Sequence, residues 1–492
     1  MAFILSLNVF LLLLSYVVVR RRLLSGPLFG GVTEANAWRL FLLLFLFGVF
    51  LRLLAFNTLT PTDEPMYAYM AKLVYSGYRP YVDFFMSQPP LYPYMTSFVF
   101  RLFGVGVIQC KILPLLSSIL SIPLLYVLVK RFYAAPPALF SVFLFSVSPG
   151  VVENTRSAVL YSELVFLSLF SAYLFLRGLD VGSRRLLFFS GACMAFAVFF
   201  RLFGVLLLVF VFVTLFFVRR KSFFRHFAPV LFGFAVVSCP LFCFFYSDAF
   251  VYQVFVHHSI FPSFGFVEKL DVFFAKASLA YPLLLSCGLV GLLLTLRQKV
   301  KSASDHYFTA YLTVSLACFF ALKYTSWVNL YMYVSFVSPA LAVLSSKLLR
   351  HLDRRYLAFY ILFFVNLVLL THYLMFLNDV RWTSSLDSAV EYTLLNTRDG
   401  DVIAGSSAVA PAVAFQTGRL LPKDLVEYSR YRFSLGEPRQ AEAVSSVSGD
   451  IKLVFLLSSD SVEDGYLACL VGDGFVEYMD AGSIRVFRRT QI

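Results

Sequence analysis

The sequence contains few charged residues, and this scarcity excludes most classes of soluble protein. Of its 492 residues only 14% are charged while 60% are hydrophobic, and the mean hydropathy is +0.79. Soluble globular domains are typically about half apolar and about one quarter charged. The composition therefore predicts an integral membrane protein built from α-helices.

Cysteine is also scarce, and the common cofactor motifs are missing. Six of the seven cysteines lie in or beside apolar runs, and Cys469 stands alone in the polar C-terminal tail. No CxxC pair is present, so neither a disulfide framework nor a zinc site is predicted. The tail has no GxGxxG, phosphate loop or nucleophile elbow. We expect no cofactor, and nothing in the sequence indicates a divalent metal.

The basic residues outnumber the acidic ones, giving a net charge of +13. They occur in short clusters between apolar runs, where Lys and Arg act as topology signals. This distribution indicates contact with a lipid bilayer and argues against a nucleic-acid partner.

Apolar runs of spanning length recur as far as Phe376. The first, residues 3–19, is followed by Arg20, Arg21 and Arg22, the reverse of the order in a cleaved signal peptide, so it predicts an anchor. The predicted spans are residues 3–19, 39–56, 108–129, 134–150, 160–177, 186–200, 203–218, 227–246, 278–296, 307–323, 330–346 and 356–377.

The positive-inside rule supports about twelve spans with both termini outside. Every second connection carries a cluster of Lys and Arg, and these connections all fall on one side. The opposite connections are longer and hold most of the carboxylates: residues 57–107, 151–159, 247–277 and the tail after 378. Any catalysis is therefore expected on the extracytoplasmic face. The short loops and the lack of an organelle signal favour a prokaryotic plasma membrane.

The outer loop 57–107 is unusually polar. Pro65 suits the first turn of a helix, with Asp63 or Glu64 near its cap. Ser76-Gly77 would end this helix on the membrane surface. Pro89-Pro90 then precedes residues 91–103, a stretch too short to span, which predicts an interfacial or re-entrant helix.

The composition changes after Asn378, which divides the chain into a membrane domain (1–377) and an extracytoplasmic domain (378–492). Short strands and helices are predicted to alternate in the second part, as in a small α/β domain. The strands are expected at 401–405, 452–458, 475–479 and 483–488, and the helices at 384–396 and 437–447.

The carboxylates with the strongest claim to chemistry are Asp63, Glu64 and Glu163. A carboxylate pair at a helix start can supply a general base or bind a metal, or simply cap the helix in solvent. Glu163 lies at the outer end of a predicted span. An ionisable residue at this place is either functional or simply located at the membrane interface. Glu153 and Arg156 are either loop charges or part of the same pocket.

Several outward cations suit a phosphate group. Arg201 interrupts two apolar runs, which favours a functional role, as we also expect for Lys323. For Lys111 and Lys276 we favour snorkelling to the interface. Two aromatic residues, Trp327 and Tyr331, either stack on a sugar ring or belong to the interfacial aromatic belt. The adjacent His257 and His258 lack the i, i+4 spacing of a helical metal site.

The outer loop resembles that of the GT-C glycosyltransferases, in particular the protein O-mannosyltransferase and aminoarabinose-transferase branch (glycosyltransferase family 39-like). The resemblance rests on Asp63-Glu64 after an early span, followed by Gly77-x-x-Pro80-Tyr81-x-Asp83 and Pro89-Pro90-Leu91. It implies a GT-C fold, a donor sugar carried on polyprenyl or dolichyl phosphate, and Asp63, Glu64 and Glu163 as catalytic residues. The substrate-binding residues are then expected to be Arg79, Tyr81, Asp83, Arg156, Arg201, Lys323 and Tyr331.

The chain departs from the family pattern at some positions. Gln88 replaces a basic residue, Met332-Tyr333 replaces a His-Tyr pair, and the span 3–19 is additional. The function expected from the resemblance is transfer of a hexose or pentose to an acceptor hydroxyl on a protein, lipid or glycan, with Asp63 as general base and with inversion. The alternatives are a transporter or flippase of lipid-linked glycans, or a non-catalytic GT-C-like subunit.

Overall fold

The computed structural model describes residues 34–54, 56–257, 265–272, 281–321, 327–350, 354–427, 450–457 and 475–489. Several predicted features lie outside these residues: the span 3–19, the helix 437–447, Lys276, Lys323 and His258. The backbone of Tyr331 is described, but its side chain is not.

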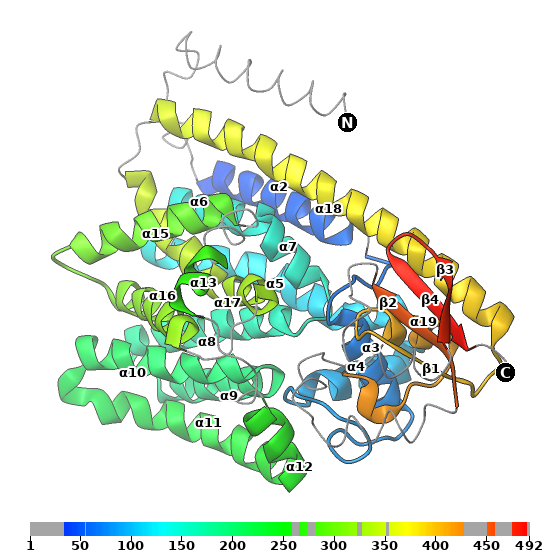
Figure 1. The fold of residues 1–492 in the computed structure, drawn as a ribbon. Coiled ribbons are helices and arrows are strands. Elements are labelled where there is room, and N and C mark those ends of the chain that lie inside the picture. The colour runs from blue at the N-terminus through cyan, green and yellow to red at the C-terminus, as the bar shows by residue number, and fades with distance from the viewer. Residues whose placement is uncertain are drawn as a thin grey trace.

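Helices form nearly all of the described part of the chain up to residue 396 (Figure 1). They are α2 (Glu34–Leu53), α3 (Glu64–Tyr75), α4 (Leu91–Phe103), α5 (Val107–Tyr133), α6 (Ala135–Val147), α7 (Pro149–Arg156), α8 (Tyr161–Val181), α9 (Arg184–Phe200), α10 (Leu206–Val218), α11 (Phe223–Phe245), α12 (Asp248–Val251), α13 (Phe266–Val272), α15 (Pro282–Arg297), α16 (Ala303–Ala321), α17 (Trp327–Ser345) and α18 (Arg354–Asn396).

Four of the described helices are long and apolar enough to cross a membrane on their own: α2, α5, α8 and the helix that ends at Phe245. Shorter apolar helices at Leu202–Val218, Leu283–Arg297 and Ser335–Leu348 coincide with further predicted spans. The chain is therefore a multi-pass helical membrane protein, as predicted.

One predicted span is broken. The run 134–150 was expected to be a single helix, but α6 ends at Val147 and α7 continues at an angle of 64°. Ser148 is extended, with a ψ of 119°, and Pro149 begins α7. Since a residue that precedes proline is disfavoured in the helical region, the break has a local cause.

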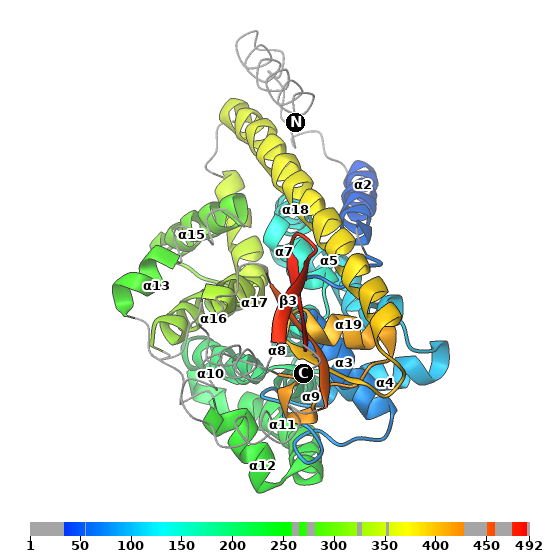
Figure 2. The same ribbon diagram turned by 45° about the vertical axis from the view of Figure 1, so that its right-hand side comes forward.

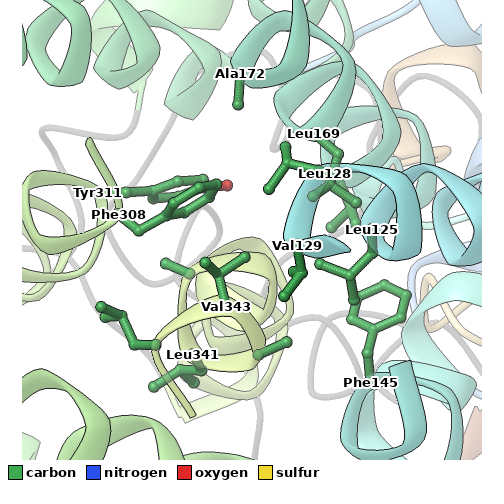
Figure 3. Packing of buried hydrophobic residues seen from close by; sticks show 14 of the residues in the cluster. Leu125, Leu128, Val129, Phe145, Leu169, Ala172, Phe308, Tyr311, Leu341 and Val343 are labelled. Carbon is green, nitrogen blue, oxygen red and sulfur yellow. The ribbon is translucent and has the colours of Figure 1, made fainter. Parts of the chain in front are cut away.

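The membrane helices pack around one large apolar core. Figure 3 shows part of it, with Leu125, Leu128 and Val129 of α5 facing α8 and the aromatic rings of α16. The phenol of Tyr311 in this core donates a hydrogen bond of 2.7 Å to the carbonyl of Phe336 in α17. A polar group within the core is thus satisfied by a neighbouring helix rather than by lipid or water.

The two helices expected in the outer loop are present with the predicted bounds. Proline stands in the first turn of α3, and Gly77 follows its end at a φ of 94°, a conformation that favours glycine. Gly104 ends α4 in the same way, at a φ of 82°. Both helices lie beside the C-terminal sheet in Figures 1 and 2.

The four predicted strands are also present, as β1 (Val402–Gly405), β2 (Ile451–Leu457), β3 (Phe475–Asp480) and β4 (Ile484–Arg489). They form a mixed sheet of order β1-β2-β4-β3, in which only β1 and β2 are parallel. The sequence did not predict the helix α19 (Ala410–Thr417), which precedes β2 along the chain.

The sheet and the outer loop share one apolar core, which contains Tyr67 and Met70 of α3 together with Val413 and Phe455 of the C-terminal part. The helix α18 crosses residue 378 without a break, so the composition changes inside a helix. The division into two domains stays a prediction.

Candidate active site

Asp63 stands at the N-terminal cap of α3, but its side chain makes no capping hydrogen bond. The residue keeps part of its surface exposed. Removal of its carboxyl group from water nevertheless raises the pKa, and the nearby Arg201 guanidinium partly offsets this by favouring the charged form. Asp63 therefore has a carboxyl group with a raised pKa, and this group makes no hydrogen bond to the backbone N–H groups of α3.

Arg201 lies where α9 ends, on a residue with extended backbone before a short 3-10 helix (Leu202–Val205). It is 5% exposed. Its Nη1 is 3.5 Å from the hydroxyl oxygen of Tyr67, and its guanidinium carbon lies 4.5 Å from the ring centroid of Tyr161. A buried cation is thus held by two aromatic residues beside Asp63.

Tyr67 and Tyr161 come from α3 and from the first residue of α8, and sequence reasoning missed both as partners of Arg201. Burial raises the pKa of Tyr67 well above its usual value, so the phenol stays protonated at neutral pH. The clustering of tyrosines in the outer loop was a signal, but pairing with Arg201 depends on the tertiary fold.

Glu64 has a different environment from Asp63. It is fully buried, and its Oε2 lies 3.2 Å from the Nζ of Lys111. The backbone N–H of Thr60 donates to Oε2 at 2.7 Å, and that of Ala158 donates to Oε1 at 2.7 Å. The Glu64 carboxylate therefore connects three segments: the outer loop through Thr60, α5 through Lys111, and the residues before α8 through Ala158.

Lys111 corrects the expectation of a snorkelling residue. Its side chain is 1% exposed and donates to the carbonyl of Thr58 as well as pairing with Glu64. The lysine is drawn inward because the buried carboxylate requires a counter-charge.

Glu163 lies in the first turn of α8 and is 2% exposed. Neither of its carboxylate oxygens has a hydrogen-bond partner among the described residues. Buried polar groups usually find partners, so the two oxygens of Glu163 retain the capacity to accept hydrogen bonds.

Arg156 takes part in a buried ion pair. Its Nη2 lies 2.5 Å from the Oδ2 of Asp379 in α18, and its Nη1 donates to the carbonyl of Leu54. The guanidinium thus connects α7 with the end of α2 and with α18.

The residues Arg79, Tyr81 and Asp83 form a local turn. Arg79 is 70% exposed, and its Nε lies 3.6 Å from the Oδ2 of Asp83. Tyr81 is buried, with its hydroxyl 2.7 Å from the carbonyl of Gln88. Its φ of 69° is unusual for a residue with a side chain, as is the φ of 67° at Leu160 before α8. Non-glycine residues in this conformation concentrate at functional sites.

The C-terminal part contributes a carboxylate that sequence reasoning missed. The Oε2 of Glu427 accepts a hydrogen bond of 2.7 Å from the backbone N–H of Ser87, and the Ser87 hydroxyl donates to its Oε1. Glu427 is also close enough to raise the pKa of Tyr67. No local motif marks this residue.

Within the described ranges, no three His, Cys, Asp or Glu side chains lie close enough together to bind one metal ion. His257 is buried there, with its ring edge-on to that of Phe85 at 5.0 Å between centroids.

The fold is similar to that of solved GT-C glycosyltransferases. Residues 87–244 match the family model of dolichyl-phosphate-mannose-protein mannosyltransferases. Among solved structures, ArnT from Cupriavidus metallidurans bound to undecaprenyl phosphate matches with a TM-score of 0.68 at 16% identity, over 92% of this chain and 98% of that one.

The oligosaccharyltransferase AglB from Archaeoglobus fulgidus is also similar. Its complex with an inhibitory peptide and a dolichol-phosphate matches with a TM-score of 0.57 at 13% identity, over 92% of this chain and 74% of that one. A search of curated proteins gives no match. At these identities the structural similarities establish the fold, and together with the family match they support a glycosyltransferase.

Proposed function

We propose that the protein is a membrane glycosyltransferase that moves a sugar from a polyprenyl-phosphate carrier to an acceptor hydroxyl. The observation that carries the proposal is that Asp63, which makes no capping hydrogen bond at the start of α3, lies near enough to the buried Arg201 guanidinium for the two charges to interact. Sugar transfer needs a base near the acceptor and a positive charge near the leaving phosphate, and this pair supplies both.

In the proposed reaction the acceptor oxygen attacks the anomeric carbon of the donor. The new glycosidic bond forms while the bond between that carbon and the phosphate oxygen breaks, and the polyprenyl phosphate leaves with the electron pair. Asp63 takes the proton of the acceptor hydroxyl. A single displacement inverts the configuration at the anomeric carbon.

Arg201 stabilises the negative charge that develops on the leaving phosphate. Since the guanidinium is buried between two aromatic residues, its interaction with phosphate is weakly screened by water. The solved structures of ArnT and AglB hold undecaprenyl phosphate and a dolichol-phosphate respectively, which supports a carrier of this chemistry.

Glu163 is proposed to bind hydroxyl groups of the sugar. An unpartnered buried carboxylate is a strong acceptor for such donors, and Glu163 is one in the described structure. By contrast, Glu64 and Arg156 are proposed to hold the site together, because each already has a buried ionic partner. Arg79 and Asp83, at the exposed turn, and Lys323 and Tyr331 remain proposed substrate contacts.

The proposed site faces the extracytoplasmic side of a plasma membrane. The positive-inside distribution supports this orientation, because the Arg-rich connections lie at the opposite ends of the helices from α3. The acceptor is proposed only by class: a hydroxyl of a protein, lipid or glycan.

The test is to incubate the purified protein in lipid nanodiscs with a panel of polyprenyl-phosphate sugars and to analyse donors and products by mass spectrometry. The proposal predicts release of polyprenyl phosphate from at least one donor, and transfer of its sugar to water or to an added acceptor. Recovery of every donor intact, from protein that still binds polyprenyl phosphate, would contradict it.

A further inference from the structure

A groove of about 650 Å³ lies between α9 and α11, at the ends of these helices far from Asp63. It is lined by Arg184, Arg185 and Arg225, with Phe189, Phe224 and Phe232 among the apolar lining residues. Arg201 is at the other end of α9, about 25 Å away for a helix of 17 residues. The groove is therefore separate from the proposed active site.

The two helices are held together by reciprocal glycine contacts. A Cβ on Gly191 would lie 1.9 Å from the carbonyl oxygen of Val230, and one on Gly233 would lie 1.9 Å from that of Phe188. The backbones therefore touch at the floor of the groove, while the large side chains on either side form its walls. Figure 1 shows α9 and α11 side by side.

The walls of the groove face lipid. Only 11% of the most apolar window of the α11 span is buried inside the protein. Phe224 is 81% exposed, and Phe232 is 64% exposed. An apolar wall this exposed on a membrane helix contacts acyl chains.

The charges at the mouth of the groove have no counter-charge from the described residues. Arg184, Arg185 and Arg225 are exposed, and no carboxylate of the described chain lies within ion-pair distance of them. The N-termini of α9 and α11 add positive partial charge at the same level. The arginines at the mouth of the groove match the negative headgroup of a lipid, and the apolar walls of the groove match its acyl chains.

We propose that this groove is a binding site for an anionic glycerophospholipid of the bilayer leaflet opposite the active site. The three arginines bind the phosphodiester, and Phe189, Ala228 and Phe232 contact the first acyl chain. The ligand class is a diacyl lipid with a net negative headgroup. Zwitterionic lipids with the same chains bind more weakly, since their ammonium group is repelled by the arginines.

The experiment is native mass spectrometry of the full chain with phosphatidylglycerol or phosphatidylcholine of identical acyl chains. The variant R184Q/R185Q/R225Q is compared with R297Q/K299Q/K301Q, which removes the same charge from another cationic loop. We expect the first variant to lose at least about tenfold in apparent affinity for phosphatidylglycerol, and the second to stay within about twofold of wild type. Equal losses in both variants would overturn the proposal, because they indicate a general charge effect.

A second variant distinguishes the contribution of the apolar groove from that of the three arginines. Ala228→Trp fills the trough while keeping all three arginines, and its exposed position makes misfolding a small concern. We expect it to reduce phosphatidylglycerol binding as well. Undiminished binding by Ala228→Trp, or a native dimer whose cross-links lie across α9 and α11, would place the lipid elsewhere and contradict the proposal.

Discussion

Asp63 and Glu64 are neighbours in sequence, but their carboxyl groups have opposite environments. Glu64 is buried with a lysine and two backbone N–H groups, whereas Asp63 makes no capping bond and has a raised pKa. A buried charge that is fully paired becomes costly only when its partner is removed. A group with a raised pKa is held in the folded state at some cost in stability. On this difference we propose a structural role for Glu64 and the chemical role for Asp63.

Replacing Arg201 is expected to change the pH dependence of sugar transfer. A general base works when it is deprotonated, so activity falls as the pH drops through the pKa of Asp63. Since Arg201 lowers that pKa, Arg201→Gln should shift the acidic limb of the kcat/KM profile to higher pH and also weaken donor binding. The measurement is kcat/KM from pH 4 to 9. An acidic limb that stays in place would show that Arg201 does not act on the base.

Breaking the buried pair of Glu64 and Lys111 is expected to destabilise the protein. Glu64→Ala leaves the lysine ammonium buried without a counter-charge, a situation that typically costs about 3–5 kcal/mol. The double variant Glu64→Met/Lys111→Met should recover part of this loss, because it removes both charges but leaves the N–H groups of Thr60 and Ala158 without their acceptor. Thermal unfolding in detergent measures the effect. Similar unfolding temperatures for the single variant and the wild type would contradict the assignment.

At the residue scale, the sequence could indicate Asp63 and Arg201 because each interrupts an apolar pattern. It could not indicate that Lys111 faces inward, because its partner is 47 positions away and the pairing exists only in the folded chain. Glu427 was missed for the same reason. Its partner Ser87 lies in a different part of the sequence.

Among the elements, those bounded by proline and glycine were predicted best. The bounds of α3 and α4 follow from Pro65, Gly77, Pro90 and Gly104, whose backbone preferences are local. The break between α6 and α7 also has a local signal in Ser148-Pro149, but hydropathy alone extends the run across it. The helix α19 has the same local signals, with Pro411 in its first turn and Gly418 after its end, but it was missed because eight residues are too few to show an apolar periodicity.

The packing of α9 on α11 predicts an effect of adding a single methyl group. In Gly191→Ala the new Cβ meets the backbone of Val230, which cannot move aside without separating the helices. Overpacking of this kind costs about 1–3 kcal/mol. We expect a lower unfolding temperature, with Ala192→Ser on the same helix as the control. If both variants unfold like wild type, the two helices are not in backbone contact.

For the whole molecule, the central feature is the core that α3 and α4 share with the C-terminal part. The ammonium of Lys72 donates to the carbonyl of Phe415 at 3.2 Å, and Trp382 donates to the carbonyl of Leu59 at 2.6 Å. The composition change at residue 378 predicted the presence of a sheet. It could not predict this shared core, which arises from contacts between distant segments.

Removing the C-terminal part should therefore destabilise the outer loop. Phe415 packs against Phe100 of α4, with 6.1 Å between ring centroids. Phe415→Ala is expected to cost about 3–5 kcal/mol, as is typical for buried aromatic truncations. Tyr478→Ala, at a position 64% exposed on strand β3, is the control for truncating an aromatic residue of the C-terminal part. Equal unfolding temperatures for the two variants would indicate that the C-terminal part is not needed to hold the outer loop.

The most direct test of the account is single-turnover sugar transfer by Asp63→Asn with a donor that the wild type accepts. Asparagine keeps the shape of the side chain but cannot take the proton, so transfer should fall by about two to four orders of magnitude. Because burial raises the pKa of Asp63, the neutral amide should leave the unfolding temperature unchanged or higher. A folded Asp63→Asn protein that transfers sugar at the wild-type rate would contradict the central claim.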